Sequence, residues 1–109
     1  MSPARSRGDA RFTREALADL RAAVAWIAKD NLAAAEGLRV AASKAARAIG
    51  DHPEIGPVRT DLAPERFRFY VLRGYPYVMV YEPDVRPPRI LRILHGAQDL
   101  NDVLAALWD

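Results

Sequence analysis

The side chains that could do chemistry lie in the second half of the sequence. His95 ends a strand-like run, and an imidazole that titrates near neutral pH suits an acid or a base. Arg73 and Arg92 could hold the charge of a phosphate beside it, and Glu82 is a more distant candidate. The alternative is structural: His95 would then only hydrogen-bond the backbone near the turn at Gly96.

Other kinds of site are not expected. The 109 residues include no cysteine, which excludes disulfides, thiol nucleophiles and thiolate metal sites. The two histidines are far apart in the sequence, and none of the six glycines has the spacing of a phosphate-binding loop. We therefore predict no metal and no cofactor.

A second set of residues suits binding rather than chemistry. Alternation within three strand-like runs places arginine and tyrosine side chains on one face of a sheet, a composition typical of protein interfaces. This predicted Arg–Tyr face consists of Arg66, Arg68, Tyr75, Tyr77, Tyr81 and Arg92. Alternatively, its arginines are solvated or are paired with the acids Asp61, Glu65, Glu82 and Asp84.

The opposite face of the same sheet is expected to be covered. Its apolar side chains are Phe67, Phe69, Val71, Val78, Val80, Leu91 and Ile93. A register error of one residue would exchange the two faces.

Two helices that precede the sheet are predicted to cover it. After Thr13, a good N-cap, apolar residues recur at helical spacing. A second, alanine-rich helix is expected over residues 32–49, with Asp30 or Asn31 as its cap and Gly50 just beyond its end. Because the connection is so short, the two helices must form an antiparallel hairpin.

These elements predict one α+β domain over residues 1–109, with residues 1–8 as a loose tail. An N-terminal helical hairpin packs on a small, mainly antiparallel sheet in the order β-α-α-β-β-β, and a short C-terminal helix follows from near Asp99. Residues 10–12 are expected to form the first strand, and Val58 to Leu62 a short edge strand. Trp108 is expected to cover the core.

This pattern resembles the RelE/ParE superfamily of toxins from type II toxin–antitoxin systems. The resemblance covers residues 10–107 and favours the ParE branch. It lies in the entry to the first helix, the Asp30-Asn31 turn, the His52-Pro53-Glu54-Ile55-Gly56 connector, and the last two strands over residues 72–81 and 90–99.

The resemblance implies a toxin that arrests growth and is neutralised by a cognate antitoxin in a hetero-oligomer. ParE-type members are known as inhibitors of DNA gyrase, so the expected mechanism is binding of gyrase, and the Arg–Tyr face is expected to bind the antitoxin or the target. No catalytic residue is then needed.

Two alternatives remain open at this point. RelE-type members cut mRNA on the ribosome, and such a ribonuclease would use Arg73, Arg92 and His95. A non-toxic, protein-binding relative is the other alternative. No run of about 20 apolar residues predicts a membrane span, and the N-terminus lacks the apolar core of a secretory signal, so a cytoplasmic protein is expected.

Overall fold

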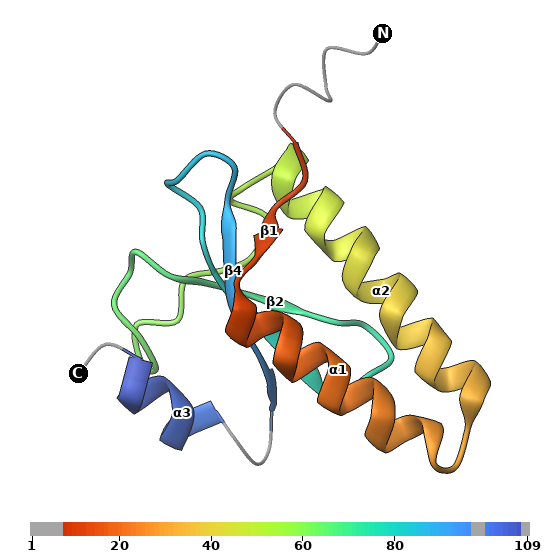
Figure 1. The fold of residues 1–109 in the computed structure, drawn as a ribbon. Helices are drawn as coiled ribbons and strands as arrows, with labels where there is room; N and C mark the ends of the chain where they lie inside the picture. Colours follow the sequence, from red (N-terminus) through yellow and green to blue (C-terminus); the bar gives the residue numbers. More distant parts are fainter. Residues whose placement is uncertain (1–7, 97–99, 108–109) are drawn as a thin grey trace, which may run out of the picture.

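A computed structural model describes residues 8–96 and 100–107, and its elements follow the predicted order (Figure 1). The first half comprises one short strand and two helices: β1 (Arg11–Phe12), α1 (Arg14–Ala28) and α2 (Leu32–Asp51). The second half comprises three strands and one helix: β2 (Arg68–Val71), β3 (Tyr77–Glu82), β4 (Arg89–His95) and α3 (Leu100–Leu107). The predictions for the tail up to residue 7, for Asp99 and for Trp108 lie outside the described residues.

The four strands form one mixed sheet in the order β1-β4-β3-β2. The β2–β3 and β3–β4 pairs are antiparallel, whereas β1 lies parallel to β4. Two backbone hydrogen bonds hold β1 beside β4: the Arg11 N–H donates to the Pro88 carbonyl, and the Thr13 N–H donates to the Ile90 carbonyl. The predicted α+β class, with a helical hairpin on a mainly antiparallel sheet, is confirmed.

Local side-chain chemistry starts both helices of the hairpin. Thr13 caps α1, since its hydroxyl accepts from the Ala16 N–H at 3.1 Å. Asn31 caps α2 in the same way, accepting from the Ala34 N–H at 2.9 Å. Each cap satisfies one of the amides that have no partner within the helix.

The sheet separates two hydrophobic clusters, one under the hairpin and one under α3. The hairpin cluster takes these residues from the sheet and its turns: Tyr70, Leu72, Tyr75, Tyr77, Met79, Tyr81, Ile90 and Ile93. The α3 cluster takes the remaining apolar residues: Phe67, Phe69, Val78, Val80, Leu91 and Leu94. The predicted assignment of faces was therefore wrong. Of the residues expected under the hairpin, only Ile93 lies there, the others in these clusters lie under α3, and Val71 is exposed.

Side-chain volume explains this arrangement. The hairpin brings many small side chains to this cluster, among them Ala16, Ala23, Ala42, Ala45 and Ala46, and fewer large ones, such as Leu20, Leu38 and Ile49. A close-packed layer opposite so many alanines needs long side chains, which tyrosine and methionine provide. The smaller α3 instead brings leucine and valine, which fit against the Phe and Val row.

A β-bulge changes the alternation within β4. Val80 pairs with Arg92 but the next residue, Tyr81, pairs with Ile90, so Leu91 is left without a partner in the ladder. Arg92 consequently lies on the Val80 face, toward α3, while Ile90 and Ile93 both face the hairpin.

Two further predictions were wrong in detail. Gly50 lies within α2 rather than after it. The N-terminal segment crosses the helix there, and a Cβ atom at this position would lie 2.9 Å from the Asp9 Cα, so only glycine fits. Residues 58–62 form no strand. Instead, the Pro57 carbonyl accepts one hydrogen bond from the Phe69 N–H at 3.0 Å and covers part of the outer edge of β2.

Candidate functional site

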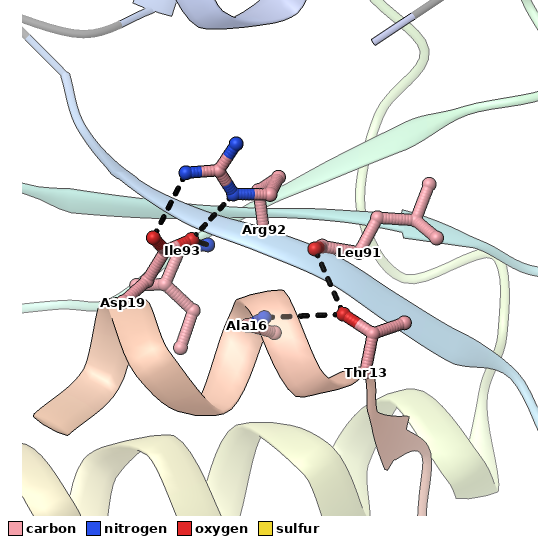
Figure 2. Close-up of polar contacts among 6 residues, drawn as sticks. All are labelled: Thr13, Ala16, Asp19, Leu91, Arg92 and Ile93. Atoms are coloured by element: carbon pink, nitrogen blue, oxygen red, sulfur yellow. Dashed lines mark hydrogen bonds and ion pairs between the residues drawn. The ribbon is translucent and has the colours of Figure 1, made fainter.

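The polar contacts around β4 begin with Thr13, at the point where β1 ends. Besides capping α1, the Thr13 hydroxyl donates to the Leu91 carbonyl at 3.0 Å (Figure 2). The Leu91 carbonyl, at the bulge, thereby accepts a hydrogen bond from a side chain rather than from a neighbouring strand.

Asp19, further along α1, forms the central contact of this junction. Its carboxylate accepts two hydrogen bonds from the Arg92 guanidinium, at 2.7 and 2.9 Å, and one from the Ile93 N–H at 2.9 Å (Figure 2). The side chains of Arg92 and Asp19 are only 26% and 17% exposed. This forked ion pair joins α1 to β4 and occupies the group expected to hold a phosphate.

The three residues of the ribonuclease hypothesis do not lie on one face. Arg92 lies on the α3 side of β4, whereas His95 pairs with Tyr77 on the hairpin side, with the two rings edge to face at 5.6 Å between centroids. Arg73 is exposed in the turn between β2 and β3. The structure therefore does not gather the acid–base group and the two cations around one point.

The residues of the predicted Arg–Tyr face are also divided. Tyr75 and Tyr77 are half-buried against the hairpin cluster, and Tyr81 is fully buried there. Arg66 is exposed, with its guanidinium 4.5 Å from the centre of the Phe67 ring. A binding role for these residues stays a prediction, but they do not form one continuous surface.

Tyr81 and Arg68 hold the connector between α2 and β2. The Tyr81 hydroxyl donates to the Pro53 carbonyl at 2.6 Å and accepts from the Gly56 N–H at 3.0 Å. Arg68 donates to the Gly56 carbonyl at 2.8 Å and, less closely, to the Glu54 carbonyl at 3.3 Å. The connector named in the sequence resemblance is thus anchored to the sheet through its own backbone.

Burial raises the pKa of Tyr81 above its ordinary value and outweighs the Gly56 hydrogen bond, which acts in the opposite direction. In the unfolded chain this phenol loses its proton near pH 10, while the folded protein still holds it. The free energy of unfolding should therefore fall as the pH rises through about 10, and Tyr81→Phe should show a smaller fall. Urea unfolding at a series of alkaline pH values measures this, and identical pH slopes would contradict it.

A pocket that the sequence did not predict lies where the β3–β4 loop meets β1. It measures about 430 Å³ and is lined by Arg11, Val85, Arg86, Pro87 and Arg89. Two of these arginines, Arg11 and Arg89, are direct partners in the parallel β1–β4 pair. No spacing in the sequence shows this, because it depends on β1 lying beside a strand almost 80 residues away.

A smaller hollow of about 280 Å³ lies between the start of α1, β4 and α3. It is lined by Thr13, Glu15, Leu91, Arg92, Val103 and Ala106.

Across residues 8–96 and 100–107, no three histidine or acidic residues are placed to hold a metal ion. In the same described part, no helix has the length and apolarity needed to cross a membrane.

The order of elements and the two clusters define a small α+β protein with the fold that the sequence resemblance implies. The profile of the ParE toxin of the type II toxin–antitoxin system parDE matches residues 10–100, and the chain belongs to this family. A solved structure described as a chromosomal ParDE system from P. aeruginosa is similar in fold, with a TM-score of 0.68 and 20% identity over 80% of this chain and 94% of that one. A search of curated proteins finds no match. The prediction of a ParE-type toxin is confirmed.

Proposed function

We propose that this ParE-type toxin arrests growth by binding DNA gyrase in the cytoplasm, without catalysing a reaction, and that its cognate antitoxin neutralises it. The family match over residues 10–100 carries this proposal. The site geometry supports it, because the Arg92 guanidinium is engaged by Asp19 and His95 lies on the other face of the strand.

Exposed apolar side chains at the hairpin tip also support binding to a protein. Trp26, near the end of α1, is 67% exposed, and Leu32, at the start of α2, is 76% exposed. The Lys29 ammonium lies 4.8 Å from the centre of the Trp26 ring. Large apolar side chains at an exposed tip are typical of surfaces that bind a partner.

A supercoiling assay with purified gyrase and relaxed plasmid tests the proposal. Adding the purified chain in excess should stop the appearance of supercoiled plasmid. Continued supercoiling at every toxin concentration would contradict gyrase as the target. In cells, pulse-labelling after induction should show that DNA synthesis fails before protein synthesis, whereas the opposite order would indicate action on the ribosome.

His95→Ala separates binding from catalysis. If no acid–base group is needed, this variant should arrest growth as well as the unmodified toxin, and circular dichroism should confirm that it is folded. Loss of toxicity in a folded His95→Ala protein would favour the ribonuclease alternative and count against the proposed function.

A further inference from the structure

The pocket formed by Arg11, Arg86 and Arg89 has a local excess of positive charge. Across β3, β4 and β1, the row of paired residues reads Glu82, Arg89 and Arg11, and the nearby loop adds Arg86. The lining of the pocket therefore holds three guanidinium groups and no carboxylate, and the acid paired with it in the sheet is Glu82. It is engaged with Arg89 at 3.2 Å, and in the described part of the chain no ion pair or side-chain hydrogen bond involves Arg11 or Arg86.

Placing Arg11 directly beside Arg89 is unfavourable in the isolated chain. Residues paired across neighbouring strands lie close together, and like charges in such positions repel each other. The two acids nearest in sequence, Asp9 and Asp84, are exposed and form no ion pair with these arginines among the residues that the structure describes. An anion that enters the pocket would relieve this repulsion.

Charged side chains are the strongest donors that the pocket offers to such an anion. Pro83, Pro87 and Pro88 have no backbone N–H, so this loop has few amides to add. Three guanidinium groups line the pocket. Their planar forks match the two oxygens of a carboxylate.

The lining of the pocket favours a peptide over a nucleic acid. Val85 and Pro87 add apolar surface to the three arginines, which suits the methylene groups of a glutamate side chain. A nucleic acid needs a positive track along its backbone, whereas this chain carries a formal charge of only +2.

We propose that the Arg11–Arg86–Arg89 pocket binds acidic side chains of a protein partner, and that this partner is the antitoxin. Naming the antitoxin rests on the proposed function. The binding of acidic side chains rests on the pocket alone.

Titration of the purified chain with a fluorescent hexaglutamate peptide at low salt tests the pocket. The double variant Arg11→Gln/Arg86→Gln should weaken binding about tenfold. The matched control Arg21→Gln/Arg39→Gln removes the same charge from exposed positions of α1 and α2, and should weaken binding about twofold or less. Thermal unfolding checks that both variants are folded.

Three results would overturn the proposal. The unmodified chain could fail to bind the peptide, or both double variants could lose affinity equally, which would indicate unspecific attraction. A short DNA duplex could bind more tightly than the peptide and lose affinity only in the pocket variant, which would make this a phosphate site on nucleic acid. Gyrase is absent from this titration, so a negative supercoiling assay would refute the proposed function and leave the pocket result standing.

Discussion

Asp19→Ala is expected to lower the free energy of unfolding by about 3 kcal/mol, because it breaks a largely buried ion pair from one side. The substitution leaves the Arg92 guanidinium without its forked acceptor and removes the acceptor of the Ile93 N–H. Both groups would lose an acceptor in a part-buried position, and leaving such groups without a partner costs more than the net value of the contact itself. Urea unfolding followed by circular dichroism measures the change.

A graded series makes the Asp19 prediction specific. Asp19→Asn keeps a carbonyl oxygen for Ile93 but loses the charge, so it should cost about half as much as alanine. Glu36→Ala removes the carboxylate of an exposed pair with Arg39 at 3.5 Å and should change stability by less than about 0.5 kcal/mol. If Asp19→Ala were no more costly than this control, the ion pair would not join the helix to the sheet as described.

Gly56→Ala is expected to cost about 3 kcal/mol through steric overlap. A Cβ atom at this position would lie 2.9 Å from the Phe69 carbonyl carbon and 3.0 Å from a ring carbon of Tyr81, and it would overlap the Phe69 carbonyl oxygen. The obstacle is backbone on one side and a fully buried ring on the other, so no flexible side chain can move away. The connector must then separate from β2, which also weakens the Tyr81 hydrogen bond to the Gly56 N–H.

Gly96→Ala is the matched control for this substitution. The nearest atoms to its new methyl group would be the Pro76 carbonyl oxygen and a Val78 methyl, both at 3.8 Å, which is ordinary contact. Its stability should change by less than about 0.5 kcal/mol, again by urea unfolding. Equal losses in Gly56→Ala and Gly96→Ala would show that glycine is not required where the connector meets β2.

The sequence alone was sufficient for the elements whose signals are local. The cap at Thr13, a cap at Asp30 or Asn31, which the structure assigns to Asn31, and the short turn of the hairpin all depend on residues within a few positions of one another. Capping chemistry and helical spacing act over one or two turns, so they can be read without knowledge of the fold.

Only the tertiary structure decided which side of the sheet each element covers. Period-two alternation defines two faces, but here both faces are apolar, so alternation could not tell which one meets the hairpin. Packing settled it, because a hairpin rich in alanine needs large partners to fill the core and the tyrosines provide them. The bulge at Leu91 then placed Arg92 on the face opposite to Ile90, although regular alternation would put these two residues on one face.

The contacts that define the candidate sites are likewise long-range. Asp19 and Arg92 are 73 residues apart, and Arg11 meets Arg89 only because β1 lies parallel to β4. Neither pairing has a local signal, since surface arginines and acids occur throughout this sequence. Local chemistry determined the elements of this toxin. Pairing between distant residues determined that Asp19 engages Arg92 and that Arg11, Arg86 and Arg89 line a pocket at the surface.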